Sequence, residues 1–236
     1  MTITSVLIDF DGTISLGDST DALLARFADP AWLDVESAWV RGEIGSRRCL
    51  AEQVGLLSLS PERLRAFASA TQLDPAFPGF LELCRFLSLP VTVVSDGFDL
   101  LVQGALAAAG IVLPVVANRL AYAGDGRWSA SFPHADEHCR AGAGNCKCAT
   151  FAASGTAASG ATGAVLIGDG RSDFCAAGAA DVVFAKGRLL RHCREERIAC
   201  HPFENFADVT AGLIALLDAQ APAIAPGRVA AQPTLP

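Results

Sequence analysis

The sequence predicts an α/β protein with a Rossmann-like parallel sheet and a helical insertion after the first strand. Short, nearly continuous apolar runs alternate with segments of helical periodicity, a pattern typical of parallel strands covered on both faces. These runs end at polar or glycine-containing turns. One long stretch, from Asp18 to about Ala76, has helical periodicity and contains no such run. We therefore expect a helical cap inserted into an α/β core.

The expected strands and helices follow from these two patterns. Apolar runs predict strands at Ser5–Phe10, Val91–Ser95, Val115–Asn118, Ala164–Gly168 and Val182–Ala185. Helical periodicity predicts helices at Gly79–Leu87, Phe98–Ala109, Ala149–Ala158, Ser172–Ala179, Gly187–Glu195 and Asn205–Leu217. A Gly-Asp-Gly sequence in the middle of Leu120–Phe132 predicts a β-hairpin. The predicted organisation is a core of residues 1–16 and 77–218, a cap of residues 17–76, and a loose Ala- and Pro-rich tail of residues 219–236.

The composition indicates an acidic globular protein. Apolar residues make up 51% of the 236-residue chain, which allows a sizeable core and argues against general disorder. The formal net charge of −7 argues against nucleic-acid binding, because such binding needs a basic face. There is no basic, apolar leader and no apolar run of about 18 residues. We expect a cytoplasmic protein with no membrane partner, and the composition does not predict the oligomeric state.

Eight cysteines are scattered through apolar segments of the chain. Without a secretory leader, we expect reduced and mostly buried thiols. A structural zinc site is an open alternative, because four potential ligands lie close together in the sequence: His138, Cys139, Cys146 and Cys148. Their spacing matches no common zinc finger, so we favour free thiols.

Two carboxylates follow the first expected strand, in the sequence Asp9-Phe10-Asp11-Gly12-Thr13. Side chains alternate along a strand, so Asp9 and Asp11 leave on one side and Phe10 on the other. Gly12 lets the chain turn sharply, and Thr13 adds a hydroxyl. Taken alone, this pattern also fits an ordinary turn, because Asp-Gly is common in turns.

Two further motifs supply groups that could bind a phosphate. Ser95-Asp96-Gly97 ends the second expected strand, and a helix N-terminus with a hydroxyl and free N–H groups is an anion site. By itself, a plain helix N-cap explains this motif better. Lys147 is one of only two lysines and precedes an expected helix, which suits a phosphate ligand. A lone lysine is more often a solvated surface charge.

The fourth motif adds two carboxylates, Asp169 at the end of a strand and Asp173 one helical turn later on the same side. All four motifs lie at carboxyl ends of expected parallel strands, where open α/β sheets bind their ligands. The carboxylates of Asp9 and Asp11 would therefore converge with these two. Two unpaired carboxylates about 4 Å apart repel by about 4 kcal/mol at an effective dielectric of 20. A bound cation explains such a cluster, and oxygen ligands favour Mg²⁺ over zinc.

This order of motifs resembles the haloacid dehalogenase superfamily, and the likeness extends from Val6 to about Val209. The helical insertion resembles the type 1 cap of the phosphoserine phosphatase branch. Two stretches, Trp39–Cys49 (WVRGEIGSRRC) and Ile167–Phe206, are similar to the 2-hydroxy-3-keto-5-methylthiopentenyl-1-phosphate phosphatases of methionine salvage. The resemblance implies hydrolysis of a small phosphorylated metabolite.

The resemblance also implies a role for each motif residue. Asp9 would be the nucleophile and form an aspartyl-phosphate, and Asp11 would be the general acid and base. Mg²⁺, the only cofactor expected, would be held by Asp9, the backbone carbonyl of Asp11, Asp169 and, in a supporting role, Asp173. The phosphoryl oxygens would be held by Thr13, Ser95, Gly97 and Lys147.

The cap would select the substrate, and charged side chains there are candidate contacts. We expect these contacts from Glu36, Arg47 and Arg48, although a solvated helix face explains at least one of the arginines better. Trp32 and Trp39 are interpreted as apolar core of the cap.

One departure from the family bears on this interpretation. The second motif reads Ser-Asp-Gly where relatives often have Ser-Gly-Gly, so Asp96 fits only if its carboxylate faces away from the phosphate.

Several rival functions are also open. Phosphoserine phosphatase and phosphotransferase activities use the same intermediate. A phospho-accepting signalling protein, or a binding protein without turnover, would belong to another functional class. Asp9 on the first strand beside Asp11 favours turnover.

Overall fold

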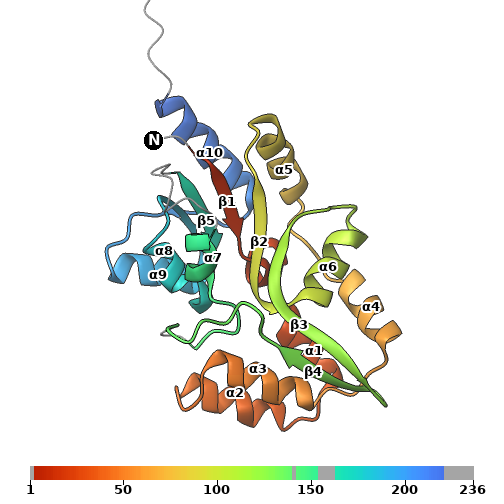
Figure 1. The fold of residues 1–236 in the computed structure, drawn as a ribbon. Helices are drawn as coiled ribbons and strands as arrows, with labels where there is room; N and C mark the ends of the chain where they lie inside the picture. The colour runs from red at the N-terminus through yellow and green to blue at the C-terminus, as the bar shows by residue number, and fades with distance from the viewer. Residues whose placement is uncertain (1–2, 140–141, 154–162, 221–236) are drawn as a thin grey trace, which may run out of the picture.

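A seven-stranded sheet forms the centre of the molecule (Figure 1). The computed structural model describes residues 3–139, 142–153 and 163–220. The strand order is β4-β3-β2-β1-β5-β6-β7, and only the pairing of β3 with β4 is antiparallel. The strands are β1 (Ser5–Ile8), β2 (Val91–Phe98), β3 (Val115–Gly124), β4 (Arg127–Ser131), β5 (Ala164–Gly168), β6 (Val182–Ala185) and β7 (His201–Pro202). The predicted α/β class is therefore confirmed.

Helices occupy the segments between the strands. Those between β1 and β2 are α1 (Ser19–Phe27), α2 (Trp32–Val40), α3 (Ser46–Gly55), α4 (Pro61–Ser69) and α5 (Phe77–Phe86). The others are α6 (Asp99–Ala108), α7 (Lys147–Ala153), α8 (Phe174–Ala177), α9 (Gly187–Glu195) and α10 (Phe206–Gln220). A short 3₁₀ turn at Arg171–Asp173 precedes α8, so the helix expected at Ser172–Ala179 is shorter and irregular at its start.

Alternate side chains of the strands bury the two faces of the sheet. Val6 and Ile8 of β1 pack in one cluster with residues of α5, α6 and α10, whereas Leu7 packs in another with residues of α7, α8 and α9. Helices thus cover both faces, which is why the strands are continuously apolar.

The register of β1 brings the predicted motifs to one edge of the sheet. Ile8 of β1 lies beside Val93 of β2 and Ile167 of β5, so the residues that follow these strands emerge side by side. The Asp9 N–H donates to the carbonyl of Ile167 at 2.9 Å, which extends this pairing by one residue. In Figure 1, α2 and α3 lie beyond this carboxyl edge, at the opposite end of the sheet from α10.

A third apolar cluster joins the helical insertion to the rest of the chain. It combines residues of α1, α3, α4 and α6 with Leu120 and Trp128 of the β3–β4 hairpin. The indole N–H of Trp128 donates to the carbonyl of Leu59 at 3.0 Å, between α3 and α4. The hairpin, which the sequence predicts, thus supports the helical insertion. The exact core and cap boundaries stay a prediction.

Two predictions fall partly outside the described residues. The helix expected at Ala149–Ala158 is described only from Lys147 to Ala153. The tail was expected from Ala219, but α10 continues to Gln220, and residues 221–236 lie outside the described part of the chain. Within the described residues, no helix combines the length and the apolar character that crossing a membrane requires.

The structure corrects the expectation that all thiols are reduced, because Cys148 and Cys175 form a disulfide. Their Cα atoms lie 6.0 Å apart where α7 meets α8, and this proximity depends on packing that residue spacing does not show. Because its sulfur is in the disulfide, Cys148 cannot be a thiolate ligand of the alternative zinc site. Among the described residues, metal-ligand spacing is found only for a group of three aspartates, so the structure does not support a His138–Cys139–Cys146 site.

Candidate active site

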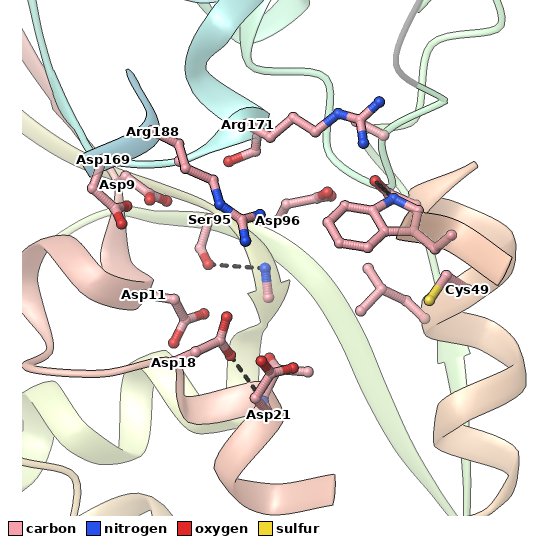
Figure 2. A pocket seen from close by; sticks show the side chains of 18 of the residues that line it. Asp9, Asp11, Asp18, Asp21, Cys49, Ser95, Asp96, Asp169, Arg171 and Arg188 are labelled. Carbon is pink, nitrogen blue, oxygen red and sulfur yellow. Dashed lines mark hydrogen bonds between the residues drawn. The ribbon is translucent and has the colours of Figure 1, made fainter. Parts of the chain in front are cut away.

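A cavity of about 430 Å³ lies at the carboxyl edge of the sheet. Five residues of the four predicted motifs line it: Asp9, Asp11, Ser95, Gly97 and Asp169. Figure 2 shows four of these side chains around one space, with Asp9 and Asp169 on one side and Asp11 on another. The convergence expected from the strand ends is therefore present for these residues.

The turn after β1 separates polar from apolar side chains. Phe10 is fully buried in the core of the sheet, while Asp9 and Asp11 face the cavity. Gly12 has a φ of +71°, a conformation that residues with a side chain rarely adopt. A Cβ at this position would lie 2.6 Å from Asp169 Oδ2. Gly12 thus allows both the turn and the close approach of Asp169.

Replacing Gly12 with alanine is expected to destabilise the protein by roughly 1–3 kcal/mol, because the backbone would be strained and Asp169 displaced. Urea denaturation measures this loss in the free energy of unfolding. Gly17→Ala is the matched control, because a Cβ there meets nothing within 4 Å and the backbone is not left-handed. Equal stability of the two variants would contradict this role of Gly12.

Lys147, the first residue of α7, holds two of the aspartates together. Its ammonium group lies 2.6 Å from Asp9 Oδ1 and 2.6 Å from Asp173 Oδ1, and the side chain is 1% exposed. Burial alone would lower the pKa of Lys147, but the carboxylates of Asp173 and Asp9 raise it above its ordinary value. Burial raises the pKa of both Asp9 and Asp173 to about 6, and the Lys147 charge opposes this rise. The lysine is therefore a buried cation rather than a solvated one.

Three carboxylates form a cluster that could hold a divalent cation. Oxygen atoms of Asp9, Asp169 and Asp173 all lie within 4.8 Å of one another. One lysine cannot neutralise three carboxylates, so a net negative charge remains in a largely buried place. Oxygen-only ligands and uncompensated charge fit Mg²⁺.

Asp11 and Thr13 lie outside this group of three aspartates. The carboxylate of Asp11 is not part of the cluster, and the expected metal contact through its backbone carbonyl stays a prediction. Thr13 was predicted to bind phosphate, but it does not line the cavity, and its hydroxyl donates to Asp169 Oδ1 at 3.2 Å. The position of Thr13 therefore suits orientation of a metal ligand rather than contact with a phosphate.

Asp11 is held in a different environment from Asp9. The backbone N–H and the hydroxyl of Ser19 both donate to Asp11 Oδ1, at 2.7 and 2.6 Å. Burial, followed by the negative charge of Asp18, raises the pKa of Asp11 well above its ordinary value. A buried lysine thus accompanies Asp9, whereas a carboxylate and a serine accompany Asp11. This asymmetry favours a charged Asp9 and a protonated Asp11.

The Ser95-Asp96-Gly97 motif accommodates its extra acid through the chain's own donors. Ser95 is buried, and its hydroxyl accepts the N–H of Gly97 at 2.9 Å. Asp96 Oδ1 accepts the backbone N–H of Asn145 at 2.8 Å and a longer hydrogen bond from Asn118 Nδ2 at 3.3 Å. These donors offset the charge of Asp96. The bond from Asn145 also connects the Ser95-Asp96-Gly97 motif to the segment immediately before Lys147.

Only one of the three cap residues predicted to contact the substrate lines the cavity. Glu36 lines it and accepts a hydrogen bond from Gln53 Nε2 at 3.0 Å. Arg47 is exposed outside the lining, and Arg48 pairs with Glu52 at 2.7 Å on the surface. The structure therefore places neither arginine at the cavity, and both are exposed charges of α3.

Arginine side chains of the core and an aromatic side chain of the cap line the cavity instead. Arg171 and Arg188 line it from the start of the 3₁₀ turn and of α9, and Arg191 follows one turn later. Trp39, interpreted from the sequence as cap core, lines the cavity. The guanidinium of Arg171, which Figure 2 labels, lies 5.5 Å from the centroid of the Trp39 ring. Trp32, by contrast, packs on the third apolar cluster, as expected. The position of the arginines after β5 and β6 was the signal that could have revealed them.

Comparisons with known proteins agree with this geometry. A family model described as haloacid dehalogenase-like hydrolase matches residues 6–178. A 2-hydroxy-3-keto-5-methylthiopentenyl-1-phosphate phosphatase of Exiguobacterium sp. is 35% identical over 88% of this chain and 96% of its own length. The Pdp3-interacting factor 1 of Schizosaccharomyces pombe is 31% identical over 86% of this chain and 92% of its own length.

A solved structure shares the fold. It represents a phospho-aspartyl intermediate analogue of phosphoserine phosphatase, with a TM-score of 0.68 and 20% identity. The superposition covers 90% of this chain and 99% of that one.

Proposed function

The chain belongs to the haloacid dehalogenase-like hydrolases and is a phosphatase, and we propose that it hydrolyses a small phosphate monoester through an aspartyl-phosphate at Asp9. The observation that carries this proposal is the asymmetric pair of Asp9 and Asp11 in one cavity. Lys147 lies 2.6 Å from Asp9, and no cation contacts Asp11 among the described residues. The two acids thus suit the different tasks that phosphoryl transfer requires.

Asp9 is positioned to attack phosphorus. A dianionic phosphate is repelled by a carboxylate, so the site needs positive charge beside the nucleophile. The ammonium of Lys147 supplies one such charge, and Ser95 and Gly97 line the same cavity as Asp9. When the oxygen of Asp9 bonds to phosphorus, the bond between phosphorus and the ester oxygen breaks.

Asp11 is the group that gives its proton to the departing alcohol oxygen. In the second half of the reaction, it takes a proton from the water that attacks the aspartyl-phosphate, and Asp9 is released as a carboxylate. Ser19 holds Asp11 Oδ1 through two hydrogen bonds, which leaves Oδ2 for the proton transfers.

Asp9, Asp169 and Asp173 are the side chains that would hold Mg²⁺, together with the Asp11 carbonyl that the family resemblance implies. The ion would supply charge compensation for the phosphoryl oxygens. Thr13 and the N–H of Gly170 orient the carboxylates of Asp169 and Asp173 through hydrogen bonds of 3.2 and 3.1 Å.

Mg²⁺ binding is expected to tighten as pH rises from 5.5 to 7.5. The pKa values of Asp9 and Asp173 are raised to about 6, so at pH 5.5 the metal must displace protons that are absent at pH 7.5. One or two displaced protons correspond to a roughly 4- to 16-fold change in affinity. Calorimetry in two buffers of different ionisation enthalpy measures both the affinity and the released protons. A pH-independent affinity would contradict this assignment of the ligands.

For the substrate, we propose 2-hydroxy-3-keto-5-methylthiopentenyl-1-phosphate, the compound named in a relative that is 35% identical to this chain. The walls of the cavity suit such a molecule. Figure 2 shows Arg188 on the side of the cavity opposite Asp18 and Asp21. Trp39 and Leu50 also line the cavity and offer apolar surface for a thioether. A role in methionine salvage, in the cytoplasm, is part of this proposal.

The test is phosphate release from three esters, in Mg²⁺ and in EDTA. The esters are 2-hydroxy-3-keto-5-methylthiopentenyl-1-phosphate, phosphoserine and p-nitrophenyl phosphate. We expect metal-dependent turnover and the highest kcat/KM for the first. A higher kcat/KM for phosphoserine would reassign the substrate, and transfer to an added alcohol would indicate a phosphotransferase. Phosphorylation without turnover would indicate a signalling protein.

A further inference from the structure

Thr20, in the first turn of α1, carries a buried hydroxyl that the proposed chemistry does not yet use. Its side chain is 8% exposed and lines the active-site cavity. Within the described part of the chain, Thr20 Oγ1 has no hydrogen-bond partner. A buried hydroxyl without a partner is costly, so its presence at the wall of a ligand cavity points to a partner on the ligand.

The space that this hydroxyl faces is defined by Gly97. A Cβ on Gly97 would lie 3.2 Å from Thr20 Oγ1, 3.1 Å from Ser95 Oγ and 2.6 Å from Asp11 Oδ2. Three side-chain oxygens thus converge on one small volume, which the missing side chain of Gly97 leaves open. An ester oxygen that packs against Gly97 would lie on the side of Asp11 Oδ2 and Thr20 Oγ1.

The orientation of Asp11 identifies which part of the ester belongs here. Asp11 Oδ1 is occupied by the N–H and the hydroxyl of Ser19, at 2.7 and 2.6 Å. Asp11 Oδ2 is the oxygen on the side of Gly97 and Thr20. If Asp11 is the proton donor, the oxygen that receives the proton lies beside Thr20 as well.

We propose that Thr20 is a further catalytic residue, whose hydroxyl donates a hydrogen bond to the leaving alcohol oxygen. This inference rests on the proposed function, in which Asp11 protonates that oxygen. As the bond from phosphorus to the leaving oxygen breaks, its electron pair stays on that oxygen, which takes the proton of Asp11 Oδ2. Thr20 keeps its own proton and stabilises the negative charge that develops before the proton transfer is complete. In the second half of the reaction, the same hydroxyl orients the water that attacks the aspartyl-phosphate.

The test uses two aryl esters that differ only in a para nitro group on the leaving phenol, phenyl phosphate and p-nitrophenyl phosphate. Thr20→Val removes the hydroxyl and keeps the branched shape, whereas Thr20→Ser keeps the hydroxyl. We expect Thr20→Val to lower kcat/KM about tenfold or more for phenyl phosphate, because phenolate needs stabilisation as it departs. For p-nitrophenyl phosphate, whose anion departs readily, we expect a loss of less than about threefold. Thr20→Ser should resemble the wild type with both esters.

The possible outcomes separate this role from structural damage and from failure of the proposed function. An equal loss with both esters, or no loss with either, would overturn the role of Thr20 at the leaving oxygen. Thermal unfolding of Thr20→Val should occur at a temperature no lower than that of the wild type, since the substitution removes a buried hydroxyl without a partner. If wild-type protein in Mg²⁺ releases phosphate neither from these two esters nor from 2-hydroxy-3-keto-5-methylthiopentenyl-1-phosphate, the proposed phosphatase chemistry is refuted together with this inference. If the wild type turns over both esters and Thr20→Val loses the same fraction of kcat/KM with each, only the inference about Thr20 is refuted, and the proposed phosphatase function is not.

Discussion

Replacing Asp9 with asparagine is expected to abolish turnover, with kcat for phosphate release lowered roughly 10⁴-fold or more. The amide has nearly the same shape as the carboxylate, but its oxygen is a poor nucleophile for phosphorus. Asp9 is 5% exposed and bound to Lys147, so a group outside the site cannot readily replace it. Phosphate release from the best ester in Mg²⁺ measures the loss.

A covalent readout distinguishes the nucleophile from a residue that only positions the substrate. Wild-type protein is mixed with an ester labelled in its phosphoryl group and quenched in acid. The protein should retain the label as an aspartyl-phosphate, and the asparagine variant should retain none. Asp34→Asn is the matched control, because Asp34 is an exposed carboxylate of α2 outside the cavity lining. Label on the Asp9→Asn variant would show that another residue accepts the phosphoryl group.

Replacing Lys147 with methionine is expected to lower the free energy of unfolding by about 3–5 kcal/mol, because two buried carboxylates lose their cation. Methionine keeps the length of the side chain, so the loss reflects charge more than volume. Activity should fall as well, since Asp9 would lose its positive neighbour. Urea denaturation in EDTA measures the stability without a contribution from bound metal.

The loss in Lys147→Met is expected to be larger at pH 8 than at pH 5. Lys147 lowers the pKa values of Asp9 and Asp173, which burial has raised to about 6, so both values rise further without it. The folded variant then holds protons that the unfolded chain releases above its ordinary Asp pKa near 4, and stability declines as pH rises. At pH 5 both carboxyls are largely protonated in the folded state, which reduces the penalty.

Lys186→Met is the matched control for this lysine. Lys186 is the other lysine in the chain; it is half-buried and pairs with no carboxylate among the described residues. We expect this variant to retain most of its stability, with no pH-dependent difference from the wild type. A similar loss in both variants would show that the Lys147 ion pairs contribute no special stability.

Local sequence was sufficient to predict every described strand except β7, and to predict that the motif residues follow strands of one sheet. Apolar runs such as Ala164–Gly168 are strands whose bounds match the prediction, because burial on both faces of a sheet imposes that pattern on consecutive residues. The structure places Asp9 and Asp169 together because each follows a strand, and the carboxyl ends of parallel strands share one edge.

The use of each hydroxyl and of each cation was not predictable from local sequence. Thr13 and Thr20 both lie near the first motif, yet the Thr13 hydroxyl donates to Asp169, whereas the Thr20 hydroxyl has no hydrogen-bond partner in the described part of the chain. The sequence predicted cap arginines at the substrate, whereas the structure supplies Arg171 and Arg188 from the core. A periodic pattern identifies the buried face of an element, but not the partner that packing brings to its exposed side chains.

The chain's fold class, the order of its motifs and its family follow from properties that neighbouring residues carry: apolar periodicity, turn-forming glycines and acidic residues at strand ends. The contacts of Lys147 with Asp9 and Asp173, the disulfide between Cys148 and Cys175, and the wall that Trp39 forms all join residues distant in the chain. Such contacts depend on how helices pack across the sheet and on which buried charges must be neutralised. These are properties of the three-dimensional arrangement, and no local stretch of sequence encodes them alone.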